Sequence, residues 1–175
     1  MSQGLWIFII VILSFFALFL IIDTVIFIYV LRLKKSIKKR SITINSLMAQ
    51  QYDLVTLLGK KMLDLGIELP ENLLVSLDLH EKKEMNKLST SERIKMKTLI
   101  TDCGGALLLL LNTSSDVDLK SLNSIVNSMD EFNHRYRQET ILYNQDIYAY
   151  NYWVHFWTFY LVALVFNLRK REPIQ

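Results

Sequence analysis

The chain has 175 residues, of which 51% are hydrophobic, and it contains two prolines, five glycines and one cysteine. This length suits one domain with a moderate core, and the scarcity of helix breakers favours long helices joined by few loops. The single cysteine, Cys103, excludes an internal disulfide and suits a reducing compartment. We predict an all-α protein in which an N-terminal transmembrane helix continues into an antiparallel up-down bundle of about four helices.

Basic residues flank the two most hydrophobic stretches. Six of the nine residues in 32–40 are basic. These six are Arg32, Lys34, Lys35, Lys38, Lys39 and Arg40, and a second cluster follows at Arg169, Lys170 and Arg171. Residues 41–151 carry 11 basic and 15 acidic side chains, a net charge of −4. This pattern suits anionic lipid headgroups, whereas nucleic acid would need the cations on the folded domain. We therefore expect membrane lipids, and no nucleic acid, as partners.

The N-terminal region carries the clearest signal. Residues 5–22 are apolar and uncharged, and the run resumes after Asp23 and Thr24 as far as Leu31. A span needs about 20 apolar residues, so we predict an anchor at 1–31 with its helix at 5–31. A cleaved signal peptide is disfavoured, because no basic side chain precedes the run and no small-residue cleavage site follows it.

The cations also predict an orientation. Six basic residues follow the helix and none precedes it, so the positive-inside rule predicts a single-pass protein of the cell (inner) membrane with its N-terminus outside. Trp6 and Tyr29 lie where interfacial aromatics are expected. Asp23 has two interpretations. It lies near the inner headgroups, as its isolation beside Thr24 favours, or it is a proton or ion site or a contact with a partner helix.

Residues 32–151 have the pattern of a cytoplasmic antiparallel bundle. Apolar residues recur at helical spacing from Ile37 to Met62, which predicts one helix from about Leu5 to about Leu65, ended by Gly66 and Pro70. Pro70 and Glu71 then suit the first turn of a second helix. Its expected inner residues are Leu73, Leu74, Leu77 and Met85.

Two more helices follow. Ser89 and Glu92 form a capping box for a third helix, which precedes a turn at residues 112–116. Its expected inner residues are Ile94, Leu99, Ala106, Leu107, Leu110 and Leu111. A fourth helix is predicted from near Asp118 to about residue 151. Its inner residues are predicted to be Leu119, Leu122, Ile125, Val126, Met129, Phe132, Tyr136, Tyr143, Ile147 and Tyr150.

Residues 152–175 form an aromatic, amphiphilic C-terminal segment. Its apolar part of about 16 residues would span only about 24 Å as a helix, and a crossing would place the second basic cluster outside. Trp153, Trp157 and Tyr160 favour the membrane interface. An interfacial or shallow re-entrant helix is therefore favoured over a second span, which stays open.

Four motifs in chain order resemble the LemA family of bacterial membrane proteins over nearly the whole chain. They are Gln51-Tyr52-Asp53-Leu54-Val55, His80-Glu81-Lys82, Asp118-Leu119-Lys120, and the pair Tyr143-Asn144 and Tyr150-Asn151. The C-terminal segment is similar as well. Departures include Gln51 for Arg, Thr56 for Pro, Leu57 for Asn and Thr158 for Pro, as in a divergent member. The resemblance implies an antiparallel helical bundle, and it supplies no biochemical mechanism.

Three further patterns each have a structural and a functional interpretation. Two stripes at seven-residue spacing, Tyr136, Tyr143 and Tyr150 beside Arg137, Asn144 and Asn151, indicate a packing seam or a polar groove for a peptide or headgroup. His80-Glu81-Lys82-Lys83-Glu84 suits a solvated helix face better than a metal site, since His134 and His155 lie elsewhere. Cys103-Gly104-Gly105 within a helix indicates a close helix approach or a kink, rather than a nucleophile.

The resulting functional hypothesis is a non-enzymatic scaffold or adaptor without a cofactor or bound metal. It would present the bundle to protein partners, or to a second copy, at the cytoplasmic face. The alternative is a lipid-binding or membrane-remodelling protein that acts through the two basic clusters and the aromatic segment. An enzyme acting on lipid is disfavoured, because the sequence has no phosphate-binding glycine loop, paired-cysteine zinc pattern or nucleophile elbow.

Overall fold

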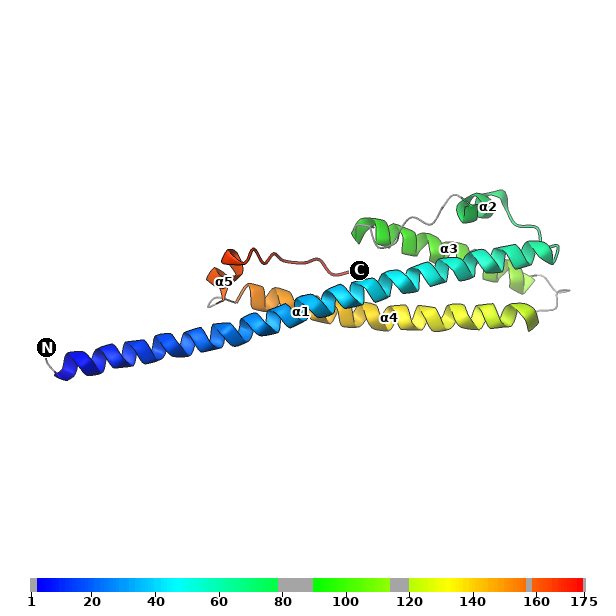
Figure 1. Ribbon diagram of the computed structural model, residues 1–175. Coiled ribbons are helices and arrows are strands. Elements are labelled where there is room, and N and C mark those ends of the chain that lie inside the picture. Colours follow the sequence, from blue (N-terminus) through cyan, green and yellow to red (C-terminus); the bar gives the residue numbers. More distant parts are fainter. Residues whose placement is uncertain (1–2, 79–89, 114–119, 157–158, 175) are drawn as a thin grey trace. The chain divides into compact units, whose positions relative to one another are not determined.

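The structure, a computed structural model, describes residues 3–78, 90–113, 120–156 and 159–174. Every regular element in these residues is a helix (Figure 1). The helices are α1 (Gln3–Asp64), α2 (Glu71–Asp78), α3 (Thr90–Thr113), α4 (Lys120–Val154) and α5 (Tyr160–Val165). The predicted all-α class, with a long apolar N-terminal helix followed by further helices, is confirmed.

The chain forms two compact units. Unit 1 consists of Met1–Lys39 and Tyr143–Pro173, and unit 2 consists of Arg40–Leu142 and Ile174–Gln175. Each unit therefore combines segments that are far apart in the sequence.

The long first helix begins and ends as expected. It has no break between residues 3 and 64. Gly66 adopts a positive φ of 80°, its N–H donates to the carbonyl of Leu63, and the N–H of Ile67 donates to that of Met62. These two bonds form a Schellman motif, which satisfies carbonyls that the helix end leaves open and favours glycine at the left-handed position.

In unit 1, the start of α1 has no neighbouring element (Figure 1). None of its side chains from Gly4 to Val25 is buried. Among the described residues, α1 is the one helix long and apolar enough to cross a membrane. Further along, the buried residues follow a helical stripe at Ile26, Val30, Leu33 and Ile37.

The end of α4 packs against this stripe in an antiparallel sense. The ring centroids of Tyr29 and Trp153 are 6.2 Å apart, and seven residues further along α1 the Ser36 hydroxyl donates to the Asp146 carboxylate at 2.7 Å. The rings of Phe159 and Phe166, on either side of α5, lie 6.4 and 4.6 Å from that of Phe27. The C-terminal segment is thereby held to α1.

The C-terminal segment does not form the helix that a second span would need. α4 ends at Val154, and α5 contains only six residues. At 1.5 Å per residue, six residues extend about 9 Å, far less than a hydrocarbon layer of about 30 Å. Because α4 and α5 are separate helices, the apolar part of the segment is not one continuous helix.

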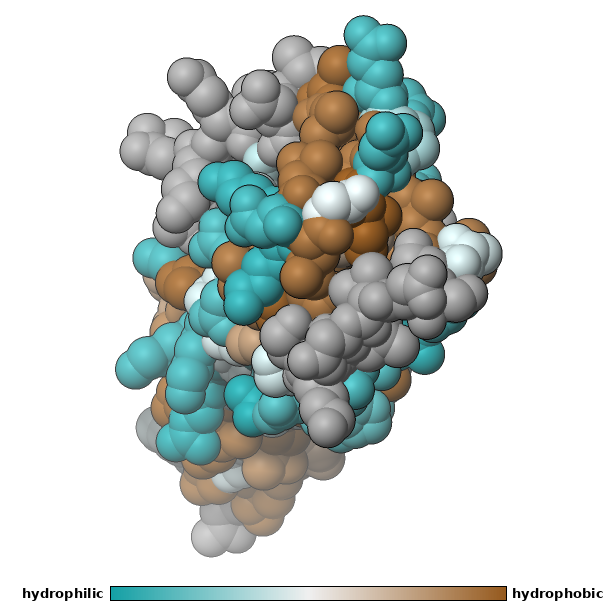
Figure 2. Space-filling view, turned by 90° about the vertical axis from the view of Figure 1, so that its right-hand side faces the viewer, coloured by the Kyte–Doolittle hydropathy of each residue, from teal (hydrophilic) through white to brown (hydrophobic). Residues whose placement is uncertain are grey.

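In unit 2, the later part of α1 packs with α3 and the earlier part of α4. The buried residues of α1 include Ile44, Met48, Val55, Leu58 and Met62, and those of α4 include Leu122, Ile125 and Met129. Most of the predicted inner residues of α1 and α4 are buried, whereas Leu54, Val126 and Phe132 are only partly covered. Figure 2 shows the end of unit 2 at which α1 terminates, with apolar side chains grouped among hydrophilic ones.

The predicted inner faces of α2 and α3 were partly wrong. Leu74 is exposed while Leu73 is buried, because consecutive residues point about 100° apart around a helix. On α3 the buried stripe is Met96, Ile100, Cys103, Leu107 and Leu111. Ile94 is exposed, and Leu99, Ala106 and Leu110 are only partly covered. The run Leu107–Leu111 is apolar on every side of the helix, so its periodicity could not define the inner face.

Gly104 explains why α3 faces inward as it does. A Cβ added at this residue would lie 3.0 Å from Met129 Cε on α4 and 3.4 Å from Val55 Cγ2 on α1. At Gly105 the same atom would meet nothing within 4 Å. The predicted close helix approach is therefore found at Gly104 alone.

Candidate functional site

Most of the basic residues predicted to contact headgroups are exposed. Arg32, Lys34, Lys35, Lys38 and Lys39 lie on the surface of α1 in unit 1. The structure separates Arg40 from this group, since its guanidinium pairs with Glu139 of α4 in unit 2 at 3.0 Å. Each of these two side chains keeps between a quarter and a third of its surface exposed, so the pair contributes little to stability.

The predicted interfacial aromatics differ in their surroundings. Trp6, Tyr29 and Tyr160 are exposed, whereas Trp153 is half-buried in an aromatic cluster. The Trp153 ring lies 5.2 Å from that of Tyr152 and 5.4 Å from that of Phe156, measured between centroids. Trp157 lies outside the described residues. Aromatic residues of this segment therefore pack within the protein as well as lining its surface.

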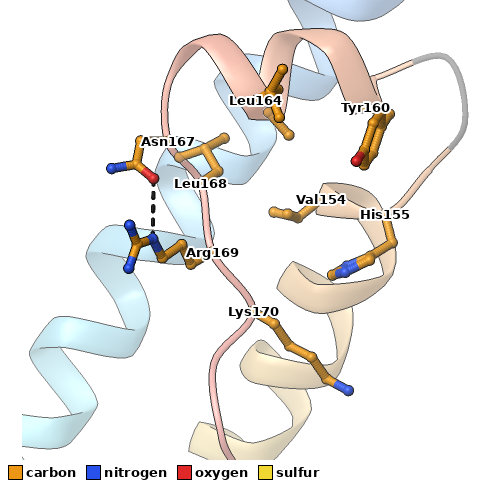
Figure 3. Close-up of a pocket in the computed structure, with 9 residues that line it drawn as sticks. Val154, His155, Tyr160, Leu164, Asn167, Leu168, Arg169 and Lys170 are labelled. Carbon is orange, nitrogen blue, oxygen red and sulfur yellow. Dashed lines mark hydrogen bonds between the residues drawn. The ribbon is translucent and has the colours of Figure 1, made fainter.

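Two cations of the second basic cluster line a pocket in unit 1 (Figure 3). This C-terminal pocket has a volume of about 300 Å³ and lies between the end of α4, α5 and the chain after α5. Its lining comprises Val154, His155, Tyr160, Ala163, Leu164, Asn167, Leu168, Arg169 and Lys170. Apolar walls beside basic side chains are suited to an amphiphilic anion.

The turn after α5 shapes this pocket. Asn167 has a positive φ of 49°, its N–H donates to the carbonyl of Leu164, and the N–H of Leu168 donates to that of Ala163. Asparagine is one of the few residues that tolerate this conformation at a helix end. The Asn167 side chain also accepts a hydrogen bond from Arg169 Nε at 3.1 Å, which fixes that guanidinium at the rim.

Asn151 holds the chain beyond the pocket. Its Nδ2 donates to the carbonyl of Arg171 at 2.8 Å, and its Oδ1 accepts from the N–H of Arg171 at 2.9 Å. The guanidinium carbon of Arg171 lies 5.5 Å from the centre of the Tyr150 ring. Two residues of the fourth family-like motif therefore fasten the C-terminal segment to α4, a role that their spacing did not indicate.

The tyrosines at seven-residue spacing belong to the packing. Tyr136, Tyr143 and Tyr150 are all buried, as the packing-seam interpretation requires. The parallel stripe is mixed: Arg137 is exposed, while Asn144 and Asn151 are partly covered.

The other family-like motifs are only partly described. On α1, Tyr52 is buried, Asp53 is exposed and Leu54 is intermediate. His80, Glu81, Asp118 and Leu119 lie outside the described residues, as do Met85 and the cap Ser89, and the side chains of Leu77 and Lys120 are not described. The motifs therefore do not converge on one site in the described structure.

A polar cluster that the sequence analysis missed joins three helices of unit 2. Lys97 Nζ on α3 donates to Gln51 Oε1 of α1 at 2.6 Å and to Asn133 Oδ1 of α4 at 3.1 Å. Gln51 is buried, and its Nε2 also donates to Asn133 Oδ1. Buried polar groups need such partners. The sequence places Gln51 in the first family-like motif, where it replaces an arginine, and no periodicity relates these three positions.

Lys97 and Tyr136 have shifted pKa values. The Lys97 ammonium lies 4.3 Å from the centre of the Tyr136 ring. Burial, with a smaller effect from the positive charge of Arg137, lowers the Lys97 pKa to about 8. Burial also raises the pKa of the Tyr136 phenol, against smaller opposing effects of Thr140 and Arg93.

Cys103 and Asp23 are the remaining reactive or charged groups singled out by the sequence. Burial raises the pKa of the Cys103 thiol against the opposing hydrogen bond with Ser76, which makes the nucleophilic thiolate scarce. Asp23 Oδ1 is hidden from solvent and has no hydrogen-bond partner among the described residues. No group of three or more His, Cys, Asp or Glu side chains that could hold a metal ion occurs in the described part of the chain.

These features define the class of protein: an all-helical chain with one N-terminal helix long and apolar enough to cross a membrane. No family model, curated protein or solved structure matches the chain.

Proposed function

We propose that the protein is a divergent LemA-like scaffold or adaptor, anchored by α1 and without enzymatic activity. The proposed anchor crosses the cell membrane once, with the N-terminus outside and the helical bundle in the cytoplasm. The observation that carries the proposal is the continuity of α1. Its exposed apolar start passes without a break into a helix with exposed cations and then into the core of unit 2.

The end of unit 2 supplies a surface for a protein partner. Exposed large apolar residues cluster in the sequence around the end of α1 and α2: Leu63, Leu65, Leu74 and Val75. Figure 2 shows apolar side chains gathered on this end of the unit. Exposed apolar patches with polar rims are typical of protein interaction sites, which supports a scaffold or adaptor.

A comparative pull-down in mild detergent tests this proposal. We expect the wild-type chain to recover a discrete protein partner, and the double substitution Leu74→Ser with Val75→Ser to lose it. The control Ile42→Ser changes an exposed apolar residue of α1 in the same unit and should retain the partner. Recovery of lipid without protein would contradict the adaptor.

The C-terminal pocket supports lipid binding as a second candidate function. Arg169 and Lys170 line apolar walls, as a phospholipid with an anionic headgroup would require. In vesicles containing anionic lipid, we expect Arg169→Gln with Lys170→Gln to reduce vesicle clustering by the reconstituted protein. The control pair Lys60→Gln with Lys61→Gln removes equal charge from exposed positions near the C-terminal end of α1, in unit 2. Equal vesicle clustering by the two double variants would contradict lipid binding through this pocket.

A further inference from the structure

Unit 2 contains a second pocket, which is lined by two basic side chains. The Lys97 pocket, of about 330 Å³, lies between α3, α4 and Ile174 near the C-terminus. It is lined by Ile94, Lys97, Thr98, Tyr136, Arg137, Thr140, Ile141 and Ile174. Among the residues that the structure describes, neither Lys97 nor Arg137 forms an ion pair with a carboxylate. Two cations thus share one pocket without an acidic partner.

A third basic residue lies close to these cations. Arg93, one helical turn before Lys97, donates to the Ser41 hydroxyl at 2.9 Å and acts electrostatically on Tyr136. The described contacts of the Lys97 ammonium are with the uncharged amides of Gln51 and Asn133 and with the Tyr136 ring. Arg137 is close enough to disfavour the charged form of Lys97. An anion in the pocket would offset this repulsion.

A guanidinium donor and apolar walls complete the pocket. Thr140 also lines the pocket, but its Oγ1 is buried and its hydroxyl interacts with the Tyr136 phenol. The guanidinium of Arg137 is exposed and can donate two parallel hydrogen bonds to a carboxylate or phosphate. Ile94 and Ile141 are exposed apolar walls, and Ile174 is buried against the same pocket. These walls suit an apolar body attached to the anionic group.

We propose that the Lys97 pocket binds a small organic anion, a carboxylate or a phosphate ester, with Lys97 and Arg137 on the anionic group and Ile94 and Ile141 on the apolar body. This binding is independent of the scaffold function. It requires only unit 2.

Calorimetric titration of the full chain in an uncharged detergent tests the proposal with defined probes. Phenyl phosphate and benzoate supply the two anionic groups on one apolar body, inorganic phosphate lacks the body, and benzyl alcohol lacks the charge. We expect saturable millimolar or tighter binding of at least one organic anion, weaker binding of inorganic phosphate and none of benzyl alcohol. Absence of binding by both organic anions at millimolar concentration would overturn the proposal, as would equal binding of benzyl alcohol.

Substitutions locate the binding in this pocket. Arg137 is exposed and donates no hydrogen bond to a described residue, so Arg137→Gln should fold normally and weaken organic-anion binding about tenfold or more. Lys95→Gln removes an exposed lysine two residues from Lys97 and should bind as the wild type does. In addition, anion binding should raise the Lys97 pKa, followed by NMR of the lysine side chains. Wild-type affinity in Arg137→Gln, or an unchanged Lys97 pKa in the bound protein, would refute the assignment.

Discussion

The stability of unit 2 is expected to depend on the protonation of Lys97, which joins α3 to α1 and α4. Its pKa is lowered to about 8, so between this pH and the ordinary value of 10.5 the unfolded chain binds the proton more tightly than the folded one. Stability therefore increases as the pH rises through this window. We expect the melting temperature of the wild type, relative to that of Lys97→Met, to rise from pH 8 towards pH 10. Circular dichroism in an uncharged detergent, without added organic anions, measures this difference.

Lys95→Met is the matched control for this pH dependence. It removes a lysine from the same helix, but from an exposed position, so its profile should parallel that of the wild type. The comparison is best made below pH 10, because the raised pKa of Tyr136 gives an opposite slope once unfolded tyrosine ionises. A wild-type profile that parallels that of Lys97→Met would contradict the lowered lysine pKa.

Asn151 is the residue whose removal should release the C-terminal segment. Asn151→Ala loses both hydrogen bonds to the backbone of Arg171. Each such bond contributes about 1 kcal/mol, so local opening should become about tenfold or more frequent. Limited trypsin digestion should then cleave the Arg169–Arg171 region correspondingly faster.

The control for this digestion is Asn127→Ala. Asn127 is an exposed asparagine of α4 in unit 2, and its replacement should leave cleavage near Arg171 unchanged. Equal cleavage rates in Asn151→Ala and the wild type would show that these two bonds do not hold the segment.

At the scale of the helices, the two neighbouring glycines of α3 make a paired prediction. Gly105→Ala meets no neighbour and should stabilise the protein by about 1 kcal/mol, because alanine favours helix over glycine by that amount. Gly104→Ala gains the same propensity but presses on Met129 and Val55. We expect it to be less stable than Gly105→Ala by about 1 kcal/mol or more, as measured by denaturant unfolding. Equal stability of the two variants would contradict the close packing at Gly104.

The sequence predicted the helices better than their faces. Local chemistry that needs no tertiary contact predicts the unbroken course of α1, its end at Gly66 and the start of α2 at Glu71. The face of α3 does not, because residues 107–111 are apolar on every side of the helix, and the buried face is defined by packing such as the close approach at Gly104.

The sites illustrate the same limit. Exposed cations and aromatics on α1 were predictable from composition, since their position depends on one helix. The Lys97 cluster requires Gln51, Lys97 and Asn133, which lie on three helices and are 46 and 36 residues apart in sequence. Likewise, no spacing rule pairs Asn151 with Arg171, because this contact depends on the turn at Asn167.

At the scale of the whole molecule, the proposed orientation can be tested by cysteine labelling. In a Cys103→Ser background, single cysteines at positions 2, 41 and 175 are labelled in intact cells with a reagent that does not cross membranes. We expect labelling at position 2 and none at 41 or 175, because the cations after the anchor favour the inner side. Cytoplasmic labelling after permeabilisation provides the control. External labelling at 41 would reverse the orientation, and labelling at both 2 and 175, without labelling at 41, would indicate that the C-terminal segment crosses.

Unit 1 joins residues 1–39 to residues 143–173, so a ribosome synthesises residues 40–142 between its two parts. The stripe formed by Ile26, Val30, Leu33 and Ile37 is made before the residues of 143–173 that pack with it. While residues 40–142 are synthesised, that stripe must be sheltered by lipid or by a chaperone, since uncovered apolar surface promotes aggregation. A nascent chain arrested before residue 143 should therefore be the species that binds chaperones most strongly.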